Sequence, residues 1–130
     1  MNDRYLYRAK RIFDGKWEEG FLTKINRQMH IVNQCGENTA HQIDESTICQ
    51  CTGVKDKNGK LIFENDIVII NGWIGKVMWS SHDISYIVLP NDEIKNETYC
   101  LGYWIIECDV EVIGNETDNP ELLEVTRENV

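Results

Sequence analysis

Cys49 and Cys51, separated by one residue, are the closest-spaced cysteines in the sequence. Thiolates bind zinc, but a structural zinc site needs four ligands, which usually come as two close pairs. The second pair is missing, because Cys35 and His41 lie upstream at no familiar spacing. We therefore interpret Cys49 and Cys51 as small buried core residues, as free cysteines commonly are. Zinc binding and a catalytic thiol are the alternatives.

The cysteines also indicate the compartment. Their odd number and irregular spacing do not fit a disulfide framework; the five are Cys35, Cys49, Cys51, Cys100 and Cys108. The chain holds no run of about 18 apolar residues that could span a membrane, and residues 1–8 contain no apolar stretch typical of a signal peptide. We expect a cytosolic protein that does not contact a membrane.

Three carboxylates, those of Asp56, Glu64 and Asp66, lie close together around the dipeptide Asn58-Gly59. Such a cluster could bind a divalent cation, but its spacing does not match the twelve-residue calcium loop. We favour turn chemistry instead. Asp56 is expected to accept hydrogen bonds from backbone amides of the turn, and Asp66 to fix the loop before its strand.

Catalytic motifs are absent from the sequence. It contains no phosphate-binding loop, dinucleotide-binding glycine pattern, nucleophile elbow or zinc-protease helix motif. The three histidines are scattered, at His30, His41 and His82. We therefore predict no catalytic residues, no cofactor-binding residues and no metal ligands. An enzyme of unrecognised type is kept as an alternative.

Four tryptophans are many for 130 residues; they are Trp17, Trp73, Trp79 and Trp104. We interpret them as core residues or as anchors for self-association. Tryptophans on a barrel face can also stack single-stranded bases, but a positive groove must lie beside them. Only Lys76 and Lys95 are basic within residues 64–106, which disfavours that alternative.

The positioning elements are predicted to be strands. A hydrophobic content of 42% and a charged content of 27% suit one globular domain. Asp14-Gly15, Asn58-Gly59 and Asn71-Gly72 each predict a two-residue type I′ hairpin turn, because these dipeptides tolerate positive φ at both central positions. Residues 21–25 and 30–32 predict an early hairpin.

Further strands follow from the apolar patterns. The β-branched run 67–70 indicates a strand buried on both faces, and residues 85–89 predict a strand that Pro90 ends. From residue 104 to residue 113 apolar residues alternate with mostly acidic ones, which predicts a strand with one solvated face.

Helix is expected to be scarce. Residues 91–101 are one ambiguous candidate, and residues 119–124 predict a helical turn with Pro120 at its first position.

Charge is unevenly distributed along the chain. Residues 1–30 carry seven bases and four acids, whereas residues 107–130 carry one base and eight acids. We interpret this as attraction between opposite ends, within the fold or between copies. A basic patch for a partner, or no consequence, are the alternatives. The net charge of −9 disfavours general binding to nucleic acid.

Residues 50–68 resemble the signature of the YopX family of phage and prophage proteins, which reads approximately Q-x-T-G-[LV]-x-D-x-x-G-x-x-I-[YF]-E-G-D-I-V. The opening residues Arg8-Ala9 and 17–22, and the closing residues 111–115 and 119–123, are similar to the family's beginning and end. One departure is Asn65, which replaces the family's usual glycine. Asparagine is common at left-handed backbone positions, so the turn can survive.

The resemblance implies a phage-encoded protein in the cytoplasm of the infected bacterial host, with a small SH3-like β-barrel core. It implies no activity and no catalytic residues. The motif residues are interpreted as structural turn residues: Thr52, Gly53, Asp56, Asn58, Gly59, Glu64, Asp66, Gly114 and Asn115.

We therefore predict a mostly β protein with little helix. An N-terminal β-hairpin segment covers residues 1–46, a strongly bent SH3-like barrel core covers residues 47–116, and an acidic, partly disordered tail covers residues 117–130. The favoured function is a non-enzymatic module that binds itself or another phage or host protein.

Three alternatives remain. The first is an acidic modulator of a host nucleic-acid-binding protein, which an array of regularly spaced exposed carboxylates would favour. The second, disfavoured by the net charge, is a nucleic-acid-binding barrel that uses Arg4, Arg8, Lys10, Arg11, Lys16 and Lys24. The third is the unrecognised enzyme.

Overall fold

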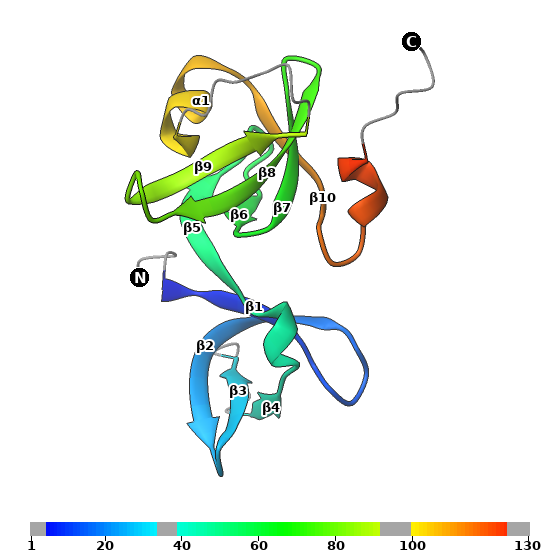
Figure 1. Cartoon of the computed structure of the whole chain (residues 1–130). Coiled ribbons are helices and arrows are strands. Elements are labelled where there is room, and N and C mark those ends of the chain that lie inside the picture. The colour runs from blue at the N-terminus through cyan, green and yellow to red at the C-terminus, as the bar shows by residue number, and fades with distance from the viewer. Residues whose placement is uncertain (1–4, 34–38, 92–99, 125–130) are drawn as a thin grey trace. The chain divides into compact units, whose positions relative to one another are not determined.

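The structure, a computed structural model, describes residues 5–33, 39–91 and 100–124 (Figure 1). The described residues form ten strands, one α-helix and short 3-10 turns, arranged in two antiparallel sheets. The expectation of a mostly β protein is confirmed. The chain divides into two compact units, Met1–Gly53 and Val54–Val130, which meet inside a strand. The boundary predicted from the sequence lies earlier, between residues 46 and 47.

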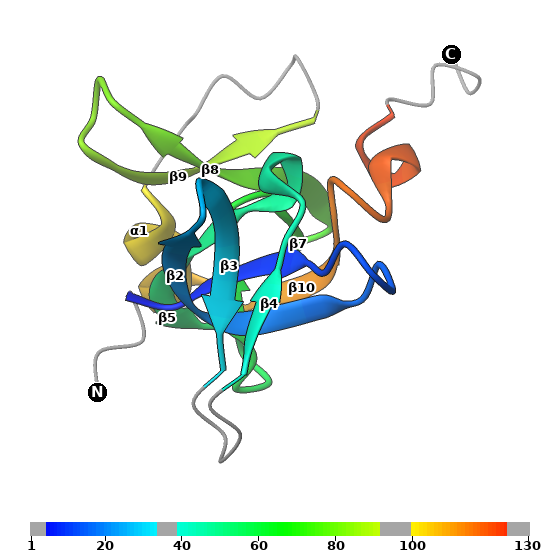
Figure 2. The ribbon, with the colours of Figure 1, turned by 90° about the horizontal axis from the view of Figure 1, so that it is seen from below.

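The N-terminal unit is an antiparallel sheet with the strand order β4-β3-β2-β1-β5, and Figure 2 shows β3 between β2 and β4. A two-residue turn, Asn26-Arg27, joins β2 to β3; both residues have positive φ, 51° and 68°. The predicted early hairpin is therefore confirmed. The strands are β1 Tyr7–Lys10, β2 Trp17–Ile25, β3 Gln28–Val32, β4 Ala40–Gln42 and β5 Cys49–Lys55, the last of which continues into the C-terminal unit.

Hydrogen bonds also join the end of β1 to the end of β4, so that this sheet curls on itself. Ile12 N donates to Gln42 O at 3.0 Å, and Asp44 N donates to Lys10 O at 2.9 Å. The side chains enclosed by the curl are those of Ala9, Ile31 and Ile43, which are at most 2% exposed. A 3-10 turn, η2 Glu45–Thr47, follows and leads to β5.

The C-terminal unit contains a sheet with the order β10-β7-β8-β9, and β6 pairs with the end of β5. β7 is buried at four of its five positions, which confirms the expected strand buried on both faces. Its elements are β6 Leu61–Phe63, β7 Asp66–Ile70, β8 Trp73–Ser80, β9 Ser85–Pro90, α1 Leu101–Glu107, β10 Val110–Asn115 and η3 Pro120–Leu123. The core consists of Ile62, Val68, Ile70, Val77, Val88, Leu101, Trp104 and Val110.

One of the three predicted type I′ turns is confirmed, and two are wrong. Asn71 and Gly72 both have positive φ, 49° and 86°, between the paired residues Ile70 and Trp73. At Asn58-Gly59 only the glycine has positive φ, and Asp56 N donates to Lys60 O across a longer loop.

The Asp14-Gly15 loop is also longer, because Arg11 N donates to Lys16 O across it. In both corrected loops an aspartate carboxylate accepts backbone N–H groups of the same loop. Such Asx bonding favours the wider turn over the two-residue one.

The strand predicted for residues 104–113 is wrong in its first part, because α1 occupies Leu101–Glu107 and the strand begins at Val110. Leu101 and Trp104 are buried, and Ile105 and Cys108 pack against the same core, whereas Ile106 is 82% exposed. This spacing of three, four and seven residues is helical. The alternating pattern and the helical pattern coexist in this segment, and packing on the core selected the helix.

The remaining expectations are tested only in part. The helical turn at residues 119–124 is confirmed by η3, with Pro120 at its beginning. The ambiguous helix of residues 91–101 lies mostly on residues 92–99, outside the described residues, as does the tail from residue 125. The described strands form two sheets and no closed barrel, so the SH3-like barrel stays a prediction. Among the described residues, no helix has both the length and the apolar character needed to cross a membrane.

Candidate functional site

Asp56, the central acid of the sequence motif, lies at the start of the β5–β6 turn, where its carboxylate accepts three backbone hydrogen bonds. Oδ1 accepts from Asn58 N and Lys60 N at 2.9 Å each, and Oδ2 accepts from Val112 N at 3.0 Å. Burial alone would raise the pKa of this carboxyl, but the three backbone N–H groups outweigh it and lower the pKa. Asp56 therefore stays ionised and ties the turn to β10.

Asp66 has a comparable task at the next turn. Its side chain is 0% exposed, and Oδ2 accepts a hydrogen bond from Phe63 N at 2.8 Å across the turn that holds Glu64 and Asn65. Asn65 has a φ of 70°, so the residue that replaces the family's glycine does occupy a left-handed position. These contacts are with backbone groups that shape the turn.

Gly114 and Asn115, predicted from the sequence to be turn residues, are instead the last two residues of β10 and lie directly before the turn of residues 116–118. A Cβ at Gly114 would lie 2.6 Å from Asn119 Oδ1, so glycine is needed for the close approach of Asn119. Asn119 Oδ1 accepts from Asn115 N at 3.2 Å, and Asn115 Oδ1 accepts from Asp118 N at 2.8 Å. The remaining motif residues, Thr52 and Gly53, lie in β5, where Gly53 has a φ of 83°.

The candidate metal-ligating side chains do not assemble in the part of the chain that is described. Its His, Cys, Asp and Glu residues form no group of three or more that could hold a metal ion. Cys49 and Cys51 are both buried on β5; Cys49 Sγ donates to Thr47 O at 3.3 Å, and Cys51 Sγ accepts from Gly53 N at 3.4 Å. Cys35 lies outside the described residues.

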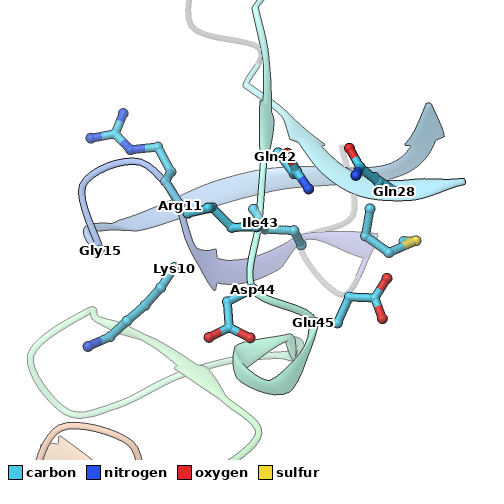
Figure 3. Close-up of a pocket in the computed structure, with 10 residues that line it drawn as sticks. Lys10, Arg11, Gly15, Gln28, Gln42, Ile43, Asp44 and Glu45 are labelled. Carbon is cyan, nitrogen blue, oxygen red and sulfur yellow. The ribbon is translucent and has the colours of Figure 1, made fainter. Parts of the chain in front are cut away.

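A concave site does exist in the N-terminal unit, where the end of β1 meets the end of β4 (Figure 3). This hollow has a volume of about 540 Å³, which lies within the range of ligand and peptide sites. Its lining is partly apolar and partly polar. The apolar residues are Ile12, Met29 and Ile43; the polar ones are Lys10, Arg11, Gln28, Gln42, Asp44 and Glu45, together with Gly15.

Basic and acidic side chains both line the hollow. Figure 3 shows Lys10 and Arg11 on one side of Ile43 and Glu45 on the other. Arg11 pairs with Asp14 at 2.6 Å. Hydrogen bonds from the Ser46 hydroxyl and from its backbone N–H lower the pKa of Asp44, so that this carboxyl stays ionised.

The loop between β1 and β2 presents two large apolar side chains beside the hollow. Ile12 is 57% exposed and Phe13 is 71% exposed. The Phe13 ring lies 5.8 Å from the ring of His41, and the guanidinium carbon of Arg11 lies 5.0 Å from its centre. His41 Nδ1 in turn lies 2.8 Å from Glu18 Oε2, a carboxylate that is itself buried. We call residues 12–15 the apolar loop.

Sequence reasoning did not find this site. The pair Ile12-Phe13 directly before Asp14-Gly15 was a usable signal, because two large apolar residues at a turn are placed in solvent. The hollow itself depends on the isolated bridge between Arg11 and Ile43, just past the ends of β1 and β4. These residues are far apart in sequence, and no local pattern predicts the bridge.

The four tryptophans occupy different environments. Trp104 is buried, and Trp73 packs against it with ring centres 5.0 Å apart. Trp17 is contacted by the cations of Arg8 and Lys10, at 4.9 Å and 5.4 Å from its ring centre. Trp79, on the β8–β9 hairpin, is 43% exposed.

The tip of the β8–β9 hairpin is a second exposed apolar feature. Ile84 is 77% exposed and has a φ of 51°, an unusual conformation for a β-branched residue. Trp79 and Tyr86 stack edge to face behind it, with ring centres 5.2 Å apart.

Comparison with known proteins places residues 6–124 in the family described as YopX protein. The match covers both units and includes every residue of the sequence motif. A search of curated proteins finds no match to the chain.

Proposed function

Because the chain belongs to the YopX family, we propose that it is a phage- or prophage-encoded protein that acts in the host cytoplasm as a non-enzymatic, self-associating interaction module. The SH3-like core that the family resemblance implies is part of this proposal. Its support is the run of antiparallel strands from β5 to β10.

The observation that carries the proposal is the apolar loop beside the hollow. Ile12 and Phe13 expose more than half of their surface, although neither is needed for the core. Large apolar side chains that are exposed together, with a polar rim around them, are typical of protein-binding surfaces.

The composition of the hollow favours binding over catalysis. Its described lining contains carboxamides, bases and carboxylates, together with apolar residues, but no Ser, Thr, Tyr, Cys or His side chain. A hydroxyl, thiol or imidazole nucleophile is therefore not part of the described lining.

The acidic-modulator alternative has lost one of its two supports. It rested on the net charge of −9 and on an acidic face along a strand from residue 104 to residue 113, and α1 interrupts that strand. Two of the remaining acids are paired, Glu111 with Lys57 at 3.9 Å and Glu116 with Lys76 at 3.3 Å. We do not extend the proposal to the nucleic-acid-binding alternative, because the net charge of −9 disfavours attraction to phosphate.

Sedimentation velocity of the purified protein over a wide concentration range tests the proposal. We expect the mean mass to rise reversibly with concentration. Affinity capture from infected cells with mass spectrometry is the complementary measurement. A protein that stays monomeric at every concentration would require the proposal to be abandoned, whatever the capture recovers.

A further inference from the structure

We propose that the hollow and the apolar loop of the N-terminal unit form one self-complementary surface, which binds the same surface of a second copy of this chain. The apolar loop of each copy enters the hollow of the other. This inference rests on the proposed function, because it specifies the surface through which the module associates with itself.

The protruding part and the receiving part of this surface lie on one patch. Ile12 lines the hollow, and the next residue, Phe13, projects into solvent. An interface with two-fold symmetry uses the same patch on both subunits. Each patch must therefore contain both a protruding part and the hollow that receives it. A buried phenylalanine contributes about 150–250 Å² of contact area, and a two-fold interface gains that area twice.

The distribution of charge around the hollow also suits a second copy. Lys10 and Arg11 lie on one side of Ile43 and Glu45 on the other, and all of them line the hollow. A two-fold rotation about the hollow brings the basic side of one copy to the acidic side of the other. Such complementarity selects the correct partner and orientation.

The apolar loop is held in place before binding. Asp14 Oδ2 pairs with Arg11 Nη2 at 2.6 Å, and Asp14 Oδ1 accepts from Lys16 N at 3.0 Å. Arg11 and His41 also contact the Phe13 ring. A loop that is already ordered loses little entropy when it binds.

The hollow can also satisfy the backbone of an entering loop. Gln28 and Gln42 lie on the same face of the β3–β4 pair, since His30 is opposite Gln42 and Gln28 is two residues from His30. Each carboxamide offers one acceptor and two donors. Two carboxamides on one face of this strand pair can therefore hydrogen-bond the backbone of a short peptide loop.

The first experiment compares Phe13→Ser with Ile84→Ser in sedimentation velocity. Both substitutions remove an exposed apolar side chain from a loop tip, but Ile84 belongs to the β8–β9 hairpin of the other unit. We expect Phe13→Ser to raise the dissociation constant of the dimer about 100-fold, and Ile84→Ser to leave it unchanged. Circular dichroism confirms that both variants are folded.

The second experiment mixes two charge reversals, Lys10→Glu and Glu45→Lys. Each variant alone places like charges across the two-fold interface, so each is expected to be monomeric where the wild type is dimeric. In an equimolar mixture, the introduced carboxylate of one variant faces the introduced ammonium group of the other, and the unchanged Lys10 faces the unchanged Glu45. The mixture is therefore expected to form heterodimers with affinity close to that of the wild type.

The outcomes separate this inference from the proposed function. If Phe13→Ser leaves the dissociation constant of the dimer unchanged, or if the mixture of charge variants stays monomeric, the proposed surface is wrong. Self-association itself would still stand. A dimer lost with Ile84→Ser and retained with Phe13→Ser would overturn it in favour of the hairpin tip. A wild-type protein that is monomeric at every concentration would overturn both.

Discussion

Asp56 shows how one carboxylate can connect distant parts of the chain. It accepts backbone N–H groups from its own turn and from Val112, which lies in the last strand. The first of these roles could be predicted from the sequence, because an aspartate two residues before Asn58 can accept the backbone N–H group of that residue, as aspartates in turns commonly do. The bond to Val112 could not be predicted, because it depends on the pairing of β10 with β7.

We expect Asp56→Asn to lower the free energy of unfolding by about 2–3 kcal/mol. An asparagine has only one acceptor oxygen, so it can serve the turn or Val112, and its amide group then meets a donor at the other site. Urea unfolding followed by circular dichroism measures the change. Asp109→Asn is the matched control, because Asp109 is exposed in the same unit, and it should shift the free energy by less than about 0.5 kcal/mol. Equal effects of the two substitutions would contradict the assigned role.

Asp56 should also make stability depend on pH in the acid range. Burial opposes the shift, but the hydrogen bonds to backbone N–H groups lower the pKa of the folded carboxyl below its usual value. The stabilisation is therefore complete above the pKa of an unfolded aspartate and is lost as the pH falls through the lower folded pKa.

Unfolding free energies of the wild type and of Asp56→Asn, measured from about pH 6 to about pH 2.5, should converge as the pH falls. A constant difference between the two proteins over this range would show that the carboxylate charge is not what stabilises the turn.

At the scale of elements, α1 is the clearest case in which a local sequence pattern led to a wrong prediction. Its residues satisfy two periods at once, because Trp104 and Ile106 alternate with Ile105 and Glu107 while Trp104, Ile105 and Cys108 follow a helical stripe. The strand β7 was predictable because its β-branched run favours a strand over a helix. Packing on the core decides that α1 follows the helical period. That core is formed by residues distant in sequence, so a short stretch of sequence does not reveal it.

The two periods make opposite predictions for neighbouring isoleucines. In the helix, Ile105 packs on the core and Ile106 is 82% exposed. We expect Ile105→Ala to cost about 1–2 kcal/mol, less than a fully buried isoleucine would, and Ile106→Ala to cost less than about 0.5 kcal/mol. Thermal and urea unfolding measure both. If Ile106→Ala lowers the free energy of unfolding more than Ile105→Ala does, the segment is a strand and not a helix.

At the scale of the whole molecule, the two units differ in the size of their cores. The C-terminal cluster contains eight buried residues, whereas the N-terminal cluster contains three. The candidate site lies in the unit with the smaller core. The sequence indicated the strands of both units, but it offered no basis for locating the hollow, which arises from contacts between strand ends that are remote in sequence.

Hydrogen exchange should detect the effect of this difference in core size. We expect amides of β1 to β4 to exchange at least about tenfold faster than those of β7 and β8, because a smaller apolar core opens at a lower free energy. Exchange with mass spectrometry of peptides from each unit measures the rates. A single rate for all strand amides would show that the two units unfold together.

The position of β10 in its sheet sets an order of events during translation. β10 is the last of the described strands along the chain, yet it pairs with β7, with Val110 opposite Ile70 and Val112 opposite Val68. Until these residues leave the ribosome, the nascent chain carries β7 with one edge unpaired, and an unpaired apolar strand edge is a template for aggregation. A premature stop codon ahead of residue 110 would make that temporary state permanent, although β5 to β9 would be intact in the shortened product.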